Sequence, residues 1–421
     1  MSRRRYFGTD GVRGIVGEDL TADLVERLGR AATTWARAGR VFVARDTRGS
    51  GPELEDALVR GVGSAGATAL LGGVLPTPAV ALSGLDLGVM ISASHNPPEY
   101  NGVKFFDSRG HKLSDAAEEE IEALLDAGAG EAGGVERLED PARFYVDHVT
   151  ESFGSDLSGL RVAVDCANGA YSTIAPRVFT QLGAQVHALF DKPDGKNINV
   201  GCGATDTAAL QRAVAGGGFD LGVAFDGDGD RMLAVDENGE LVDGDQIVAI
   251  LALDLGVDTV VVTEMTNHGF HALMRERGIR VLTTDVGDRY VLEALWRENA
   301  LLGGEQSGHV IYLRDHVSGD GLAAALLLCA ALRGRRLSEA AAVMPRWTQA
   351  KENVVVASKE LTQPVRDAVE RLNEELSGAG RVLVRPSGTE PLIRVLAEAD
   401  NEQVARDACA SLVTLVKREL G

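Results

Sequence analysis

Short valine-rich segments, each followed by a turn and a helical pattern, constrain the fold of this chain more than any other feature. Three of them, at 41–44, 162–164 and 260–262, have the composition of buried strands. After the first, we expect a helix to begin near Pro52, because proline favours the first helical turn and apolar residues recur at helical spacing from 54 to 62. Strands that alternate with helices indicate α/β layers with mixed, largely parallel sheets.

The length of 421 residues is sufficient for two to four domains. We expect three similar α/β domains, over 1–150, 151–252 and 253–348, and a smaller α+β domain over 349–421. The expected elements of the last domain are a strand at 353–357, a helix at 365–376, strands at 381–384 and 392–397, and a helix capped by Asn401.

The acidic balance of the chain limits its partners. Its net charge is −20, from 62 acidic and 42 basic residues. A surface of that sign repels nucleic acid and anionic membranes, so we expect neither as a partner. The four cysteines include no close pair, which indicates a reducing compartment and argues against a disulfide framework and a zinc site.

Two segments of the sequence indicate where in the cell the protein is found. The basic start of the chain has no apolar core behind it, so we do not expect a signal peptide. The longest apolar run, 321–332, is too short to span a bilayer, and we expect it to form a buried helix. Together these features predict a cytoplasmic protein.

The sequence Asp-Leu-Gly-Val occurs twice, at 86–89 and 220–223. Each copy begins an apolar run that ends in a polar loop, the first containing Ser94 and the second containing Asp226. Related domains would each contribute one wall to a shared site in this way. A chance match in a glycine-rich chain is the alternative.

The loop DGDGDR, at 226–231, carries the sharpest chemical signal. Its three carboxylates can converge on one point, because glycine adopts backbone conformations that other residues resist. Two carboxylates about 4 Å apart repel by roughly 4 kcal/mol at an effective dielectric near 20. The loop therefore favours a cation, and oxygen ligands suit Mg²⁺ or Ca²⁺. The EF-hand pattern counted from Asp226 fails, because Arg231 stands at its sixth position, where glycine is needed, although Glu237 stands at its twelfth. A bare acidic turn is the alternative.

The segment ISASHNPPEYNGVKFF, at 91–106, follows an apolar strand with two hydroxyls and an imidazole. Ser92, Ser94 and His95 enter a loop that two prolines stiffen, and Lys104 comes shortly after. Strand ends are where α/β proteins place their chemistry. The alternative is a polar loop whose side chains make local turn bonds.

Two further loops offer groups suited to a sugar phosphate. Residues 385–391, RPSGTEP, followed by Arg394, combine guanidinium groups and hydroxyls with a backbone free to donate N–H groups, although a plain turn is the alternative. Residues 303–309, GGEQSGH, offer an acid, an amide, a hydroxyl and an imidazole to sugar hydroxyls; taken alone, His309 would more often be structural. The glycine-rich loop around Arg13 is also compatible with phosphate.

In this order, the loops resemble the α-D-phosphohexomutase superfamily over essentially the whole chain. The segments that carry the resemblance are YFGTDGVRG (6–14), ISASHNPPEYNGVKFF (91–106), DGDGDR (226–231), VGDRY (286–290), GEQSGH (304–309) and RPSGTEPLIRV (385–395). The resemblance implies four domains around a central active-site cleft. Gln306, where glucose and mannose enzymes of the family tend to have methionine, resembles the aminosugar branch.

The resemblance also implies roles for individual residues. Ser94 would carry a phosphoryl group, and Mg²⁺ would be held by that group and by Asp226, Asp228 and Asp230. Arg13, Arg231 and His95 would lie around it, and Lys104 would be a candidate general acid or base if cationic neighbours lower its pKa. The residues implied to bind substrate are Glu305, Ser307 and His309 for ring hydroxyls, and Arg385, Ser387, Gly388, Thr389 and Arg394 for the phosphate that is not reacting.

The implied reaction converts glucosamine 6-phosphate into glucosamine 1-phosphate, on the way to UDP-N-acetylglucosamine and cell-wall precursors. It passes through phosphorylated Ser94 and glucosamine 1,6-bisphosphate, and that or a similar hexose bisphosphate would act as activator. The expected partner is a small hexosamine phosphate, and the chain could form a homodimer. The alternatives are a phosphoglucomutase/phosphomannomutase, a metal-dependent sugar-phosphate phosphatase, and a non-catalytic sugar-phosphate sensor.

Overall fold

The structure is a computed structural model that describes residues 4–8, 10–128, 130, 132–387 and 392–421. The chain divides into two compact units. The first comprises Met1–Glu264 and Leu282–Ala341, and the second comprises Met265–Val281 and Ala342–Gly421.

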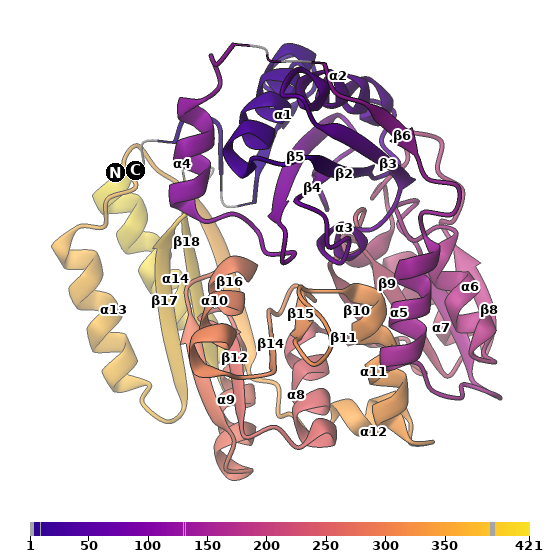
Figure 1. Cartoon of the computed structure of the whole chain (residues 1–421). Helices are drawn as coiled ribbons and strands as arrows, with labels where there is room; N and C mark the ends of the chain where they lie inside the picture. The colour runs from indigo at the N-terminus through magenta and orange to yellow at the C-terminus, as the bar shows by residue number, and fades with distance from the viewer. Residues whose placement is uncertain (1–3, 9, 129, 131, 388–391) are drawn as a thin grey trace. The chain divides into compact units, whose positions relative to one another are not determined.

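A six-stranded sheet begins the first unit, with strand order β1-β5-β4-β2-β3-β6 (Figure 1). The strands are β1 (Val12–Ile15), β2 (Arg40–Arg45), β3 (Thr68–Val74), β4 (Leu87–Ile91), β5 (Tyr100–Asp107) and β6 (Val135–Arg137). The helices that accompany them are α1 (Ala22–Ala36), α2 (Gly51–Ser64), α3 (Thr77–Ala81) and α4 (Asp115–Ala123). Strands β2, β3, β4 and β6 pair in parallel, whereas β5 is antiparallel to both β1 and β4.

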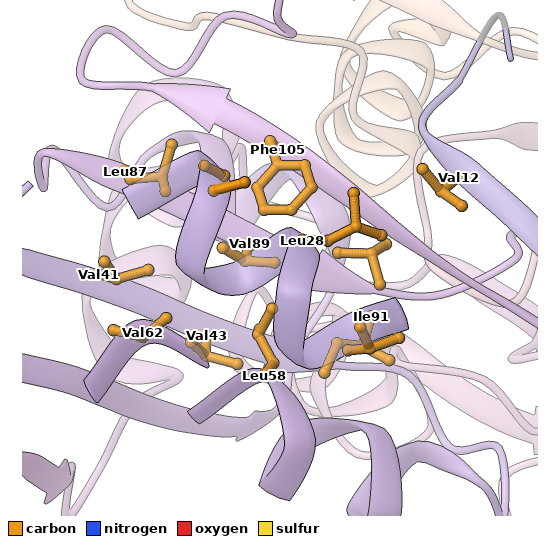
Figure 2. Close-up of a cluster of buried hydrophobic side chains, with 14 of the residues drawn as sticks. Val12, Leu28, Val41, Val43, Leu58, Val62, Leu87, Val89, Ile91 and Phe105 are labelled. Carbon is orange, nitrogen blue, oxygen red and sulfur yellow. The ribbon is translucent and has the colours of Figure 1, made fainter. Parts of the chain in front are cut away.

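The core of this layer lies between the sheet and helices α1 and α2. Figure 2 shows Leu28 and Leu58 from the helices directed toward Val89 and Phe105 of the sheet, and all four side chains are buried. Burying one such side chain contributes about 1.5–3 kcal/mol. The packing fixes strand β4, and Ser94 follows the end of that strand.

The second sheet of the first unit has the order β11-β10-β9-β7-β8. Its strands are β7 (Arg161–Asp165), β8 (Gln185–Leu189), β9 (Leu221–Phe225), β10 (Met232–Asp236) and β11 (Leu241–Val242). The adjoining helices are α5 (Arg143–Phe153), α6 (Ile174–Gln181), η1 (Gly203–Thr205) and α7 (Ala208–Gly217). Strands β8, β7 and β9 are parallel, and β10 runs antiparallel to β9.

The repeated Asp-Leu-Gly-Val segments occupy equivalent places in these two sheets. Each forms the start of a fully buried strand, β4 in one sheet and β9 in the other. The carboxylate of Asp86 accepts the backbone N–H of Arg40 at 3.0 Å, and that of Asp220 accepts the N–H of Arg161 at 2.7 Å. In both cases the donor begins the neighbouring parallel strand. The equivalence favours related domains over a chance match.

The third sheet has the order β13-β12-β14-β15. Its strands are β12 (Thr259–Thr263), β13 (Arg280–Thr284), β14 (Leu302–Gly304) and β15 (Val310–Tyr312). Its helices in the first unit are α8 (Gly244–Leu255), α10 (Asp288–Glu298), α11 (Gly321–Leu332) and α12 (Leu337–Ala341). Helix α11 is the buried helix predicted from the apolar run. Within the part of the chain that the structure describes, no helix has both the length and the apolar character needed to cross a membrane.

The second unit contains the antiparallel sheet β16-β18-β17. Its elements are α9 (His268–Glu276), β16 (Thr348–Val355), α13 (Gln363–Glu375), β17 (Gly380–Pro386), β18 (Leu392–Ala399) and α14 (Glu402–Leu420). The side chain of Asn401 caps α14, as predicted. Strand β16 begins earlier than the expected 353–357, because its polar and largely exposed residues pair with β18 through the backbone. The α/β fold class with mixed, largely parallel sheets and an α+β C-terminal part is confirmed.

Candidate active site

Ser94 lies at the end of β4 with its hydroxyl directed at the metal loop. Its backbone has φ +51°, in the left-handed region that few residues other than glycine adopt. The Oγ atom donates a hydrogen bond to Oδ2 of Asp226 at 2.5 Å, and both residues are buried. Two predicted site residues 132 positions apart are therefore in direct contact.

The three aspartates of DGDGDR follow strand β9 and converge. One carboxylate oxygen from each of Asp226, Asp228 and Asp230 lies within 4.8 Å of the others. Gly229 makes the turn possible: its φ is +78°, and a Cβ there would lie 2.4 Å from the ring of Tyr171. The loop thus requires glycine for the geometry that the sequence predicted.

The aspartate cluster has the properties of a site for a hard divalent cation. Oδ1 of Asp228 and Oδ1 of Asp230 are buried and accept no hydrogen bond from any described residue. Burial raises the pKa of Asp226 well above its usual range, and the neighbouring carboxylates of Asp230 and Asp228 raise it further. An all-oxygen set with two carboxylate oxygens that lack hydrogen-bond donors among the described residues fits Mg²⁺.

Lys104 extends from β5 into the cluster. Its Nζ lies 2.7 Å from Oδ2 of Asp228 and 3.0 Å from Oδ2 of Asp10, with Asp230 at 3.5 Å. Burial disfavours the ammonium form, but these three carboxylates outweigh it and raise the pKa of Lys104. The condition for a general acid or base, a pKa of Lys104 lowered by cationic neighbours, is not met, since the closest neighbours are anions. In this arrangement Lys104 is an ammonium ion at neutral pH.

Arg13, Arg231 and His95 surround the same point. The Arg13 guanidinium donates to the carbonyl oxygen of Ala93 at 3.3 Å, and Nε of Arg231 lies 4.0 Å from Oδ1 of Asp230. Nδ1 of His95 is 3.4 Å from Oγ of Ser94. Burial, followed by the charges of Arg231 and Arg13, lowers the pKa of His95 to about 4, so the imidazole is neutral near pH 7.

The sugar loop lies next to the metal loop. Nδ1 of His309 is 3.8 Å from Oδ1 of Asp230, and its Nε2 is 3.6 Å from Oδ2 of Asp288. Burial opposes a charge on His309, but these two carboxylates raise its pKa. Glu305 accepts the N–H of Gly287 at 3.1 Å. Ser307 is exposed, and its hydroxyl lies 3.4 Å from the Glu305 carboxylate. A narrow cavity is lined by Thr77, Lys112, Asp230, Asp288 and His309.

The predicted phosphate loop belongs to the second unit. Arg385 of β17 and Arg394 of β18 are directly opposite each other across the ladder. This register brings two positively charged side chains together on the sheet. The N–H of Ser387 donates to the carbonyl of Leu392 at 2.9 Å, and its carbonyl accepts from Lys359 at 2.9 Å. Gly388 and Thr389 lie outside the described residues.

Family models for phosphoglucomutase/phosphomannomutase match the chain in four consecutive segments. Those of α/β/α domains I, II and III match residues 4–131, 143–239 and 243–347, and that of the C-terminal domain matches 348–415. The chain belongs to the phosphoglucomutase/phosphomannomutase family. This membership confirms the predicted superfamily and the predicted enzyme class, a mutase among the isomerases. The expected bounds of the four domains stay predictions.

Relatives of this family cover almost the whole chain. The phosphoglucosamine mutase of Pelotomaculum thermopropionicum is 50% identical over 438 residues, which cover 98% of each chain. That of Desulforudis audaxviator is 48% identical and covers 97% of each. Among solved structures, a phosphoglucomutase/phosphomannomutase family protein from Burkholderia thailandensis matches with TM-score 0.83 and 26% identity, over 98% of this chain and 97% of that one.

Several residues of this phosphohexomutase site were not singled out from the sequence. Thr77 donates to Oδ2 of Asp228 at 2.6 Å, and Lys112 forms ion pairs with Asp10 and Asp288. Asp10 and Asp288 stand inside the motifs YFGTDGVRG and VGDRY, which gave a signal for them. Thr77 and Lys112 stand in no such motif, and only the folded chain shows their contacts.

Proposed function

We propose that this phosphohexomutase interconverts glucosamine 6-phosphate and glucosamine 1-phosphate through phosphorylated Ser94 and glucosamine 1,6-bisphosphate. The observation that carries the proposal is the contact between Ser94 and the aspartate cluster. A buried hydroxyl 2.5 Å from Asp226, beside carboxylate oxygens without hydrogen-bond donors among the described residues, is arranged as a phosphoryl carrier at a metal site. Phosphoglucosamine mutases at 48–50% identity support the aminosugar substrate.

Asp226, Asp228 and Asp230 would hold Mg²⁺ together with an oxygen of the phosphoryl group on Ser94. When bound, the ion neutralises charge on the phosphoryl group in transfer. The protein adds fixed positive charge around the same point through Lys104, Arg13 and Arg231. Because Lys104 is an ammonium ion, it would donate hydrogen bonds to phosphoryl oxygens rather than accept a proton.

The transfer would proceed in two steps that share these groups. In the first, O1 of glucosamine 6-phosphate attacks phosphorus, the bond from phosphorus to Oγ of Ser94 breaks, and the proton of O1 replaces the phosphoryl group on the serine. In the second, Oγ attacks the phosphoryl group at C6 of the bisphosphate, and O6 receives the proton. A free hexose bisphosphate would activate unphosphorylated enzyme by this second step.

Substrate orientation would come from two groups of residues. Glu305, Ser307 and His309 would bind ring hydroxyls beside the metal loop. Arg385, Ser387, Gly388, Thr389 and Arg394 would bind the phosphate that is not reacting, and the like-charged pair opposite each other on β17 and β18 supports this role. Gln306, which donates to Asp245 at 3.1 Å, would contribute to the choice of an aminosugar.

The different-class alternative is a sugar-phosphate phosphatase. The mutase relatives that cover 97–98% of the chain favour phosphoryl transfer to a sugar hydroxyl over transfer to water. Phosphorus-31 NMR of the enzyme with Mg²⁺, a hexose 1,6-bisphosphate and each of the 6-phosphates of glucosamine, glucose and mannose separates the possibilities. We expect 1-phosphate to form fastest from the glucosamine compound. Faster turnover of glucose or mannose phosphate would contradict the substrate, and net release of inorganic phosphate would contradict the reaction.

A further inference from the structure

Ser94 has a backbone conformation that the chain must enforce. At φ +51° a residue with a Cβ is strained, and nothing in the chemistry of serine favours that region. In this conformation Oγ donates its hydrogen bond to Asp226. A change of this backbone conformation would move the hydroxyl away from the aspartate cluster.

Arg48 is the centre of the surrounding hydrogen bonds. It is buried, at 1% exposure, and all five N–H groups of its guanidinium are used. Its Nε donates to Oδ2 of Asp46 at 2.9 Å. The other four donate to carbonyl oxygens of the loop, those of Ser94 (2.9 Å), Asn96 (2.8 Å), Tyr100 (2.9 Å) and Pro97.

Both backbone polar groups of Ser94 are bound by side chains. Its N–H donates to Oγ of Ser92 at 2.9 Å, and Ser92 in turn donates to Oδ2 of Asp46 at 2.6 Å. Its carbonyl accepts from Arg48 and also from the amide of Asn199 at 2.8 Å. Asn199 comes from the loop between β8 and η1, and it donates to Asn96 as well, at 3.1 Å. The Ser94 clamp comprises Asp46, Arg48, Ser92 and Asn199.

We propose that the Ser94 clamp is a set of positioning residues that holds Ser94 in its strained conformation while the phosphoryl group arrives and leaves. The inference rests on the proposed function of Ser94 as phosphoryl carrier. Asp46 neutralises Arg48 at 2.9 Å, so the pair adds little net charge at the site. Its effect is geometric, and a loss of the clamp lowers the rate of transfer more than the binding of substrate or metal.

Asn199→Ala tests the proposal, because it removes two neutral hydrogen bonds to the loop and leaves no buried charge unpaired. Asn199 has φ +59°, so Asn199→Gly is made beside it to separate the lost bonds from backbone strain, and both variants should behave alike. Asn197→Ala is the matched control: Asn197 lies in the same loop, and its amide donates to Lys192 of that loop at 3.0 Å. Arg48→Lys is the second variant, since lysine keeps the charge beside Asp46 but cannot make five bonds. Each protein is assayed for kcat and KM, for the rate at which glucose 1,6-bisphosphate phosphorylates Ser94 by intact mass, and for Mg²⁺ binding by calorimetry.

We expect Asn199→Ala to lose about tenfold in kcat and in the rate of Ser94 phosphorylation, with KM and Mg²⁺ affinity within about twofold of wild type. Asn197→Ala should match wild type, and Arg48→Lys should lose more than Asn199→Ala. An Asn199→Ala enzyme with unchanged kcat and phosphorylation rate would overturn the clamp while the proposed function stands. A fall in kcat accompanied by an equally large rise in KM and an equally large loss of Mg²⁺ affinity would also overturn the clamp, since it would indicate general disruption of the active site. A wild-type enzyme that never accepts phosphate on Ser94 would refute both proposals.

Discussion

The strain at Ser94 can be measured without any assay of activity. Ser94→Ala and Ser94→Gly both remove the hydrogen bond to Asp226, so their difference reports the backbone alone. The left-handed conformation costs a residue with a Cβ roughly 1–2 kcal/mol. Glycine offsets part of this by its greater freedom in the unfolded chain, about 0.4–1 kcal/mol. The glycine variant should therefore be more stable than the alanine variant by about 0.5–1 kcal/mol.

Differential scanning fluorimetry can detect a difference of this size. It corresponds to about 1–4 °C in Tm, given about 2–4 °C per kcal/mol for a medium-sized domain. Asn299 provides a calibration within the same chain, because it has φ +52° at the exposed end of α10 and lies outside the site. The same pair of substitutions there should give a similar difference. If Ser94→Ala is as stable as Ser94→Gly while the Asn299 pair differs as expected, the claim of strain at Ser94 is refuted.

Three further predictions concern other parts of the molecule. Asp228→Asn removes one of three clustered charges and should weaken Mg²⁺ binding by at least about tenfold in calorimetry, together with a large loss of turnover; unchanged Mg²⁺ affinity would show that the loop is not the metal site. Arg385→Ala should raise KM for hexose phosphates at least about tenfold, while Ser94 still accepts phosphate from a bisphosphate. Arg371→Ala, at an exposed arginine, should leave KM unchanged, and an unchanged KM in Arg385→Ala would exclude a role of Arg385 in phosphate binding. Burial, followed by the charge of Arg381, lowers the pKa of His271 to about 4. The unfolded protein therefore binds more protons at this histidine between about pH 4 and 6.5, and stability rises with pH across that window. His271→Gln should flatten this part of the profile of Tm against pH, whereas the exposed His187→Gln should not; an unaltered profile in His271→Gln would refute the lowered pKa.

Local patterns predicted the fold well. The strands at 41–44, 162–164 and 260–262 became the buried β2, β7 and β12, because apolar runs of that length have few other places in an α/β layer. The start of β16 was missed, since an edge strand with polar, exposed residues carries no hydrophobic period. Pairing with β18, set by tertiary structure, determines where it begins.

In the active site too, features set by local sequence could be predicted, whereas those set by tertiary contacts could not. Asp226, Asp228 and Asp230 were predictable because their spacing with glycine is itself the signal. The direction of the pKa shift of Lys104 could not be read from the sequence, because its effective neighbours are Asp228 and Asp10, which are 124 and 94 positions away. The role of Arg48 also depends on contacts with carbonyl oxygens about 50 residues later, and backbone acceptors leave no trace in a sequence.

Ser92 illustrates how structure refines a sequence prediction. The motif match selected Ser94 as the phosphoryl carrier and left Ser92 as a neighbour of little consequence. In the fold, the Ser92 hydroxyl is fully buried, donates to Asp46 and accepts from the N–H of Ser94. Ser92 is two residues from the carrier, and its hydroxyl is directed at Asp46 of the clamp instead of the aspartate cluster.

The central claim is that Ser94 carries the phosphoryl group, and peptide mass mapping tests it most directly. The enzyme is incubated with Mg²⁺ and glucose 1,6-bisphosphate, digested, and the peptide that contains both Ser92 and Ser94 is fragmented to locate the phosphate. We predict close to one phosphate per chain on Ser94 and none on a Ser94→Ala protein. Phosphate on Ser92, or full mutase turnover by Ser94→Ala, would contradict it.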